Sequence, residues 1–292
     1  MDYYLFQEDF EASQESMRDI AEVAQFFIHK FGGYPFKNEQ LAFAQIGFYS
    51  GIETQTCPVV ENFTNRRFYT MVHEMAHAWF ANSVTAENWQ HAWLHEGFAT
   101  YSEALYVEET KGYRAYLQYL YTYSISIANK KPMVGPRDVK FWTYKDGDPY
   151  TKGALTLHSL RSTIDNDKIF FDILKTFHLE NKRKIVTSDD FINLVNRKTN
   201  DDYTWFFKQF LNNNDLGNRI NSLLQGLDTN NLMQLSEVGQ QIRASILAQP
   251  FPQDLEDAIR LQFNQLNGHS SSASYAVRSS ATAEDLPDAS FA

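Results

Sequence analysis

The sequence contains a single cysteine and fewer basic than acidic residues, and each shortage excludes a class of protein. Cys57 is the only cysteine among 292 residues, so no disulfide forms within the chain and the redox compartment stays open. Lysine and arginine number 26 against 36 aspartates and glutamates, which gives a formal net charge of −10. Nucleic acid is therefore not an expected partner, because a basic face is needed to replace the phosphate counterions.

Long apolar runs are also absent. No segment approaches the roughly 20 apolar residues that span a bilayer. The acidic opening at 1–16 has no positively charged leader, so we expect neither a signal peptide nor a membrane anchor, and a cytoplasmic location by default. There is no internal repeat. The remaining composition, 43% hydrophobic and 15% aromatic, is typical of a globular chain of one or two domains.

The most informative residues are the five at 73–77, His-Glu-Met-Ala-His. Residues four apart lie on the same face of a helix, so His73 and His77 can bind one metal ion together. Glu74, one position further round, is predicted to take a proton from a metal-bound water. Apolar residues at helical spacing predict that this helix buries one face: Val72, Met75, Ala76, Trp79 and Phe80.

A third ligand is expected because catalytic zinc usually takes three protein ligands and one water. Glu96 is the candidate, in a second predicted helix that begins at 93–101 and could pack against the first. The five-residue motif alone also arises by chance, and the added glutamate favours the metal site. His91 and His95 lie nearby but are not needed, since a fifth protein ligand has no place on zinc.

Three segments together resemble a known family. The stretch VHEMAHAWFANSVTAENWQHAWLHEGFATYSEAL resembles the core of the aminopeptidase N class of gluzincin metallopeptidases, which also contains leukotriene A4 hydrolase. SGIETQT at 50–56 resembles the exopeptidase motif of that class, which implies that Glu53 holds the free α-amino group of the substrate. PYTKGALTLHSLR at 149–161 resembles the segment whose tyrosine, here Tyr150, hydrogen-bonds the oxyanion. The resemblance covers roughly residues 1–212 and is specific in combination.

The resemblance implies a mostly α (α+β) fold, a thermolysin-like metallopeptidase catalytic domain with a short N-terminal β portion. It implies one zinc ion per chain, bound by His73, His77 and Glu96, and release of N-terminal residues from peptides with a free N-terminus. Cobalt or manganese would suit the same ligands. Ile52 and Thr54 depart from the usual motif, so the preferred N-terminal residue is not predicted.

The large β domain that normally precedes the exopeptidase motif is expected to be missing, since the motif arrives by residue 50. An alternative is therefore a fragment that binds metal without turnover. A further alternative, which we place below these two, is an epoxide hydrolase activity like that of leukotriene A4 hydrolase.

Beyond Tyr150 the pattern stays helical. It predicts helices at 168–177 and 203–211, and another that begins at the cap-like Thr-Ser-Asp-Asp of 187–190. Turn-forming residues at 212–217 predict a domain boundary, with the peptidase domain over 1–212.

The remainder, 213–292, resembles a different family. Its end, SYAVRSSATAEDLPDASFA at 274–292, is similar to the N-terminal nucleotide-binding region of phosphoenolpyruvate synthase and pyruvate, phosphate dikinase. This implies a truncated helical piece of an ATP-grasp-type domain, with Arg278 near the ATP phosphates. Most of that fold is absent, so we expect no phosphotransfer and weak ATP binding at best. The alternatives are a remnant kinase-type activity and a helical appendage with a disordered Ser/Ala-rich tail.

Overall fold

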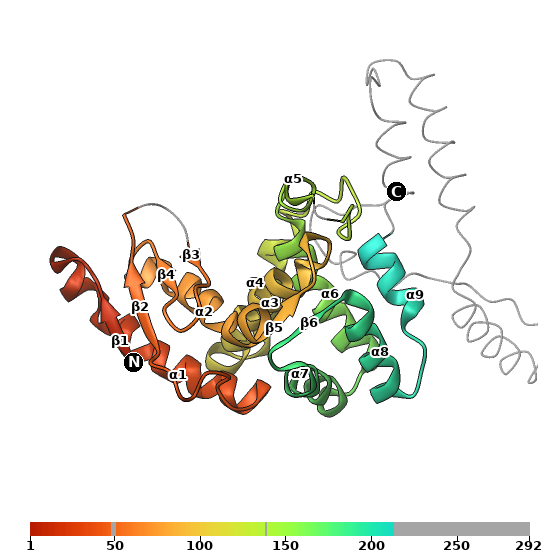
Figure 1. Cartoon of the computed structure of the whole chain (residues 1–292), viewed down its shortest axis with the longest axis horizontal. Coiled ribbons are helices and arrows are strands. Elements are labelled where there is room, and N and C mark those ends of the chain that lie inside the picture. Colours follow the sequence, from red (N-terminus) through yellow and green to blue (C-terminus); the bar gives the residue numbers. More distant parts are fainter. Residues whose placement is uncertain (48–50, 138, 213–292) are drawn as a thin grey trace, which may run out of the picture. The chain divides into compact units, whose positions relative to one another are not determined.

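A computed structural model describes residues 1–47, 51–137 and 139–212. The predictions for 213–292, including Arg278, lie outside these residues. Within the described part, helices predominate and strands are short, which confirms the mostly α fold with a small N-terminal β portion (Figure 1). None of the described helices has both the length and the apolar character that crossing a membrane requires.

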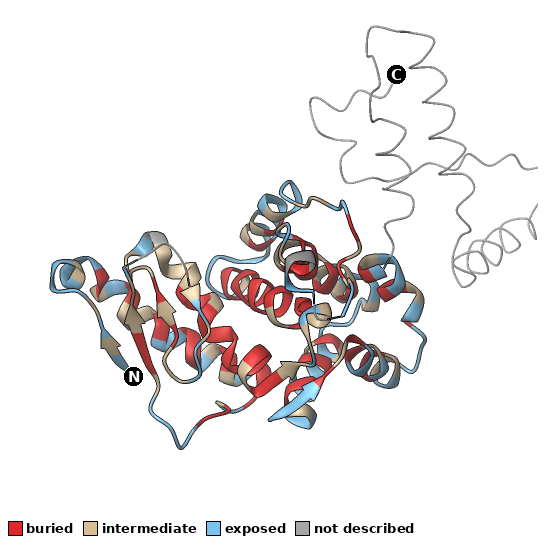
Figure 2. Cartoon of the chain, turned by 45° about the horizontal axis from the view of Figure 1, so that its top comes forward, coloured by how far each residue is buried: buried red, intermediate tan, exposed pale blue. Residues whose placement is uncertain are grey.

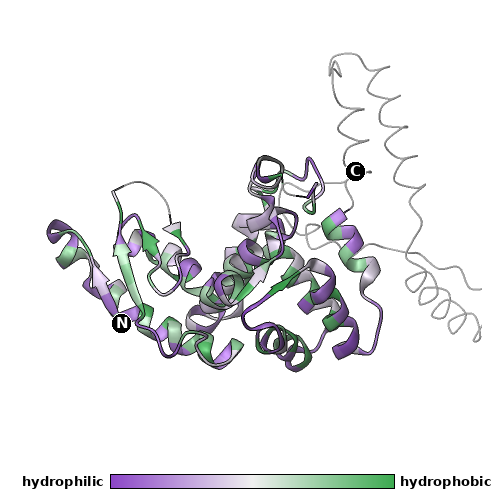
Figure 3. Cartoon of the chain, viewed as in Figure 1, coloured by the Kyte–Doolittle hydropathy of each residue, from purple (hydrophilic) through white to green (hydrophobic). Residues whose placement is uncertain are grey.

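The β portion is one four-stranded sheet beside helix α1. Its strands are β1 (Asp2–Tyr4), β2 (Ala42–Gln45), β3 (Gly51–Ile52) and β4 (Val59–Val60). Their spatial order is β1-β2-β4-β3, with β1, β2 and β4 parallel and β3 antiparallel to β4. The two valines of β4 carry the green of hydrophobic residues in Figure 3. This order leaves β3 at the edge, immediately before Glu53.

The longest described helix, α1 (Phe10–Phe31), was not predicted from the sequence. Its buried apolar residues recur at helical spacing, which is the pattern of a helix with one face in the core. They are Ile20, Val23, Ala24, Phe27 and Phe31. The helix ends at Gly32, whose φ of 97° suits glycine and whose N–H donates to the Ile28 carbonyl.

The centre of the domain is a group of packed helices. Four of them are α2 (Phe68–Ala76), α3 (Trp93–Lys111), α4 (Tyr113–Ser124) and α6 (Asp148–Ile164). Helix α3 packs against the other three and is buried along most of its length, as the red ribbon in Figure 2 shows. A helix buried on nearly all sides is a core element, so the residues that α3 carries are held rigidly.

The C-terminal helices close one side of this core. They are α7 (Asp167–Asn181), α8 (Ser188–Thr199) and α9 (Thr204–Phe207), which continues into a wider turn at Lys208–Asn212. The helices predicted at 168–177 and after Thr187 are confirmed, and the Thr187 N–H and hydroxyl both contact Asp190 Oδ2, at 2.7 and 2.9 Å. Polar residues dominate α8, which is largely purple in Figure 3.

Shorter elements connect these layers. Strand β5 (Val84–Ala86) pairs in parallel with β6 (Lys184–Val186). The remaining elements are the short helix α5 (Lys140–Thr143), three 3-10 turns (Gln7–Asp9, Asn65–Arg67 and Trp89–His91) and a π-type turn (Ala78–Ser83).

Candidate metal centre

Helix α2 carries the first two predicted ligands and places them one turn apart. The five apolar residues predicted to bury its inner face and continuation are all buried, so the helix is fixed against the core. The regular helix ends at Ala76, yet His77 keeps helical angles (φ −60°, ψ −20°), and its N–H donates to the His73 carbonyl at 3.3 Å. Both imidazoles therefore project from the same side of a rigid element.

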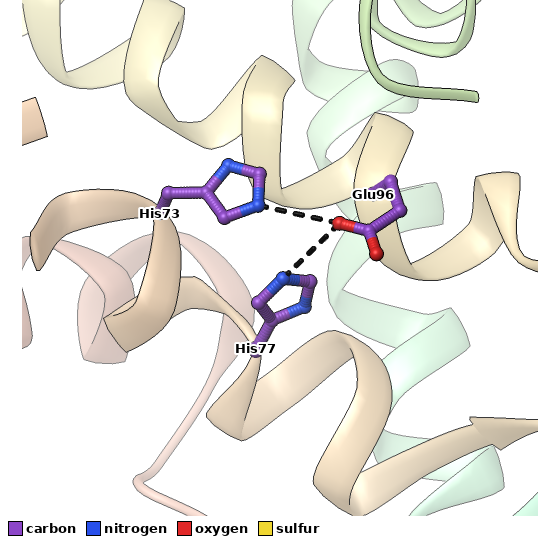
Figure 4. Close-up of side chains that lie close together, drawn as sticks. All are labelled: His73, His77 and Glu96. Atoms are coloured by element: carbon purple, nitrogen blue, oxygen red, sulfur yellow. Dashed lines mark hydrogen bonds and ion pairs between the residues drawn. The ribbon is translucent and has the colours of Figure 1, made fainter. Parts of the chain in front are cut away.

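Helix α3 brings Glu96 to the two histidines from its first turn. Figure 4 shows both rings directed at one carboxylate oxygen. The Nε2 atoms of His73 and His77 lie 3.3 and 3.5 Å from Glu96 Oε2, and one donor atom from each residue lies within 4.8 Å of the other two. Two imidazole nitrogens and one carboxylate oxygen are the donor set of many catalytic zinc sites. The three residues therefore fit a zinc ion.

The electrostatics of the cluster keep Glu96 ionised. Burial alone would raise the pKa of Glu96, but its hydrogen bonds with His73 and His77 lower it well below the usual range. Burial would lower the pKa of His73, yet hydrogen bonds with Glu103 and Glu96 raise it. Glu96 is thus a buried carboxylate that stays ionised between two imidazoles, which is the state that ligates a metal.

Glu103, which the sequence analysis missed, fixes the orientation of His73. Its Oε1 accepts a hydrogen bond from His73 Nδ1 at 2.7 Å, and its Oε2 accepts from the hydroxyls of Tyr119 (2.5 Å) and Tyr123 (2.9 Å). With its proton on Nδ1, His73 keeps its Nε2 available to bind a metal ion. Seven residues separate Glu103 from Glu96, or two turns on the same face of α3, so a sequence signal existed.

Glu74 lies buried beside the cluster, at 5% exposure. No described group hydrogen-bonds its Oε2. A Cβ at Gly51 would overlap its carboxylate, so only glycine lets strand β3 approach this closely. Burial raises the pKa of Glu74 to about 7, against the lowering effect of His73 and His77. A carboxyl with a pKa near neutrality and an unengaged oxygen can exchange protons with a small molecule in the site.

Glu53 follows β3 and lies at the His77 end of α2. One oxygen of its carboxylate, one of Glu74 and a ring nitrogen of His77 lie within 4.8 Å of one another. The Asn82 amide donates to the Glu53 backbone carbonyl at 2.8 Å and so holds this turn in place. A carboxylate in this position can pair with an ammonium group.

Two tyrosines lie next to the candidate ligands. Tyr150, in the first turn of α6, lies with its ring centre 5.9 Å from that of His73. Tyr144, just after α5, donates its hydroxyl to Glu96 Oε1 at 3.1 Å. Burial raises the pKa of both, so both remain hydrogen-bond donors. Tyr144 was not predicted, since neither a motif nor a helical pattern marks it.

The two other nearby histidines have structural partners. His95 Nε2 accepts the Ala86 backbone N–H at 2.7 Å, and His91 Nδ1 lies 2.9 Å from Ser188 Oγ.

The site residues predicted for the peptidase domain share one cavity of about 420 Å³. Its lining includes Glu53, Glu74, Tyr150 and the three candidate ligands, together with Gly51, Tyr69, Thr70, Glu103, Tyr119 and Tyr123. A larger hollow of about 670 Å³ lies between α1 and α7, and its lining includes Lys30, Lys168 and Lys175. We place the functional site in the smaller cavity, because it holds the perturbed acids and the convergent nitrogens.

Comparison with protein families gives two matches. A profile of the peptidase family M1 domain matches residues 58–210, and one of the pyruvate phosphate dikinase AMP/ATP-binding domain matches residues 204–292. The chain is 34% identical to aminopeptidase N of Oryctolagus cuniculus over 124 residues, 38% of this chain and 13% of that protein. It is 50% identical to phosphoenolpyruvate synthase of Escherichia coli over 86 residues, 30% of this chain and 11% of that protein.

Solved structures agree with the first match. The M1 zinc metallopeptidase of Deinococcus radiodurans superimposes with a TM-score of 0.60 and 25% identity, over 67% of this chain and 44% of that one. Leukotriene A4 hydrolase of Saccharomyces cerevisiae shares the fold, with a TM-score of 0.62 and 16% identity over 78% of this chain and 42% of that one. The chain thus spans less than half of each of these four proteins.

Proposed function

We propose, from the premise that the chain belongs to peptidase family M1, that it is a zinc aminopeptidase that releases N-terminal residues from peptides. One observation carries the proposal. The Nε2 atoms of His73 and His77 converge on one oxygen of Glu96, beside the buried and unengaged carboxylate oxygen of Glu74. A ligand set with an adjacent acid of pKa near 7 is suited to hydrolysis of an amide bond.

His73, His77 and Glu96 would hold one zinc ion. When bound, zinc acts as a Lewis acid that polarises the scissile carbonyl and lowers the pKa of the attacking water. The chain's own residues perform the proton transfers. Glu74 takes a proton from the attacking water and delivers it to the amine that leaves, because its carboxyl can exist in either protonation state near neutral pH.

Two further residues would orient the substrate and stabilise charge. The Glu53 carboxylate pairs with the free ammonium of the first residue, so the cut falls after that residue. The Tyr150 hydroxyl, which burial keeps protonated, donates to the oxygen on which negative charge develops. A donor of this kind typically contributes about 3–4 kcal/mol to the transition state.

The experiment that tests the proposal combines metal analysis with turnover. Elemental analysis would be made on the wild type and Glu74→Gln, together with hydrolysis of a panel of aminoacyl amides. We expect one zinc per chain in both proteins and turnover in the wild type alone. Zinc without turnover in the wild type would replace the proposal with a metal-binding, inactive chain, and absence of zinc would overturn it.

A second candidate function rests on the match of residues 204–292 to an AMP/ATP-binding domain. We propose that this part, which we separate from the peptidase domain near residue 212, binds ATP weakly through Arg278. The expected result is a small ATP-dependent rise in melting temperature that Arg278→Ala abolishes and that Arg243→Ala leaves in place. An unchanged melting temperature in the wild type would contradict it.

A further inference from the structure

One wall of the site cavity takes no part in the chemistry proposed above. It consists of Tyr69 from α2 and of Tyr119 and Tyr123 from α4, and we call these three residues the tyrosine wall. The ring centres of Tyr69 and Tyr119 lie 5.2 Å apart, and those of Tyr119 and Tyr123 also 5.2 Å. All three are partly exposed and line the cavity.

The order of residues along α2 fixes which part of a substrate meets this wall. Tyr69, His73 and His77 are four residues apart and therefore lie in a row, with about 6 Å between successive members. Glu53 lies at the His77 end of the row. A peptide with its ammonium on Glu53 and its scissile bond at the ligands continues toward Tyr69. Since an extended chain advances about 3.3 Å per residue, the residue after the cut lies beside the wall.

The Tyr123 hydroxyl offers a lone pair to a ligand. Tyr119 and Tyr123 both donate to Glu103 Oε2, at 2.5 and 2.9 Å, and Tyr123 also contacts the Tyr119 oxygen as a donor at 3.1 Å. The hydrogens of both hydroxyls are therefore engaged, and the Tyr123 oxygen is left as an acceptor. Burial raises the pKa of both tyrosines, so they remain neutral donors to Glu103.

The side chains that line the cavity include more acids than bases. Its described lining contains four glutamates, at 53, 74, 96 and 103, and neither lysine nor arginine. The ammonium of Lys111, the last residue of α3, donates to the Tyr69 hydroxyl at 3.1 Å and lies 5.4 Å from the centre of its ring. The chain's own ammonium thus shows that Tyr69 accepts a cation through its oxygen and its aromatic face.

We propose that the tyrosine wall is the subsite for the side chain that follows the scissile bond, and that it selects arginine or lysine there. The inference rests on the aminopeptidase function proposed above, because that function places the ammonium on Glu53. It adds a substrate class, peptides with a basic second residue.

The test uses three dipeptides that differ only in the second residue: Leu-Arg, Leu-Leu and Leu-Glu. Calorimetry on zinc-loaded Glu74→Gln measures binding, and hydrolysis by the wild type measures turnover. We expect Leu-Arg to bind about 10-fold more tightly than Leu-Leu, with Leu-Glu the weakest. In the Glu74→Gln background, Tyr123→Phe and Tyr69→Leu should reduce this ratio to about twofold or less. The matched controls Tyr121→Phe and Tyr121→Leu change an exposed tyrosine of α4 and should keep it.

Each outcome has a distinct meaning. The inference would be overturned by equal affinities, by a preference for Leu-Glu, or by an affinity ratio that survives both wall substitutions. Turnover without a preference for a basic second residue would also overturn it, but would leave the aminopeptidase function supported. Selective binding of Leu-Arg without hydrolysis by the wild type would support the wall and reject the aminopeptidase. Failure of all three dipeptides to bind would overturn both.

Discussion

Gly97 of α3 and Gly153 of α6 face each other so closely that neither position has room for a methyl group. A Cβ at either glycine would lie 2.8 Å from the α carbon of the other. Gly97 directly follows Glu96, and Gly153 lies one turn after Tyr150. The contact therefore sets the distance between the third candidate ligand and the tyrosine proposed to bind the oxyanion.

Replacing either glycine with alanine should destabilise the domain. The added methyl must push two buried helices apart, which typically costs about 1–3 kcal/mol. We expect Gly97→Ala and Gly153→Ala to lower the free energy of unfolding in urea by that amount. Gly33→Ala is the control, because no described atom lies within 4 Å of the Cβ it would add. Equal unfolding midpoints for all three variants would show that the helices are not held by this contact.

Glu103→Gln should weaken zinc binding with little change in fold. The amide keeps the size of the side chain but removes the negative charge that His73 Nδ1 and two tyrosine hydroxyls contact. Loss of such a partner typically reduces metal affinity about 10–100-fold. Competition with a chromophoric chelator would measure the affinity. Glu109→Gln, at an exposed position on the same helix, should bind zinc as the wild type does, and equal affinities for both variants would exclude the role given to Glu103.

Replacing Tyr150 and Tyr144 with phenylalanine should have different effects on kcat and on zinc affinity. Tyr150→Phe removes the proposed oxyanion donor, so kcat should fall about 10²–10³-fold while KM and zinc affinity change little. Tyr144→Phe removes the hydroxyl that donates to Glu96 Oε1, so its main effect should be on zinc affinity. The two roles would be exchanged if Tyr144→Phe lost kcat but bound zinc normally while Tyr150→Phe stayed active.

Motif spacing predicted the site residues whose relation is local, and the family resemblance added Glu53 and Tyr150. His73 and His77 are positioned by the geometry of one helix, and Glu96 belongs to a motif at fixed spacing from them. Glu103 could have been predicted as well, since it lies on the same face of α3 as Glu96, two turns later. Tyr144 was not, because its place depends on how the segment around α5 folds back onto α3.

The fold was predictable to a similar extent. Helices with a strong cap, such as the one after Thr187, were found at the correct place. Helix α1 carries a clear apolar period from Ile20 to Phe31, yet it lies ahead of every motif and was overlooked. The contact of Gly97 with Gly153 joins segments 56 residues apart, and no local pattern could indicate it.

Stability should depend on pH through His178, which lies fully buried in α7. Its Nδ1 donates to the Phe31 carbonyl at 2.9 Å, and no described group accepts from its Nε2. Protonation would bury an unpaired N–H and a charge, and burial accordingly lowers the pKa of His178 from 6.5 to about 4. Between pH 6.5 and 4 the unfolded chain therefore binds more protons than the folded one, and the folded state loses stability as pH falls.

The variant His178→Asn isolates this effect. Asparagine retains a donor near the position of Nδ1 but does not titrate. Between pH 7 and pH 4 the wild type should lose about 1–3 kcal/mol more unfolding free energy than the variant, given about 1.4 kcal/mol per unit of pKa shift. Urea titrations at several pH values would measure this difference in unfolding free energy. The contributions of the other titrating groups are the same in both proteins and cancel. His29→Asn, at an exposed histidine of α1, serves as the control and should follow the wild type. If His178→Asn instead parallels the wild type across this range, the buried imidazole does not set the acid sensitivity of the fold.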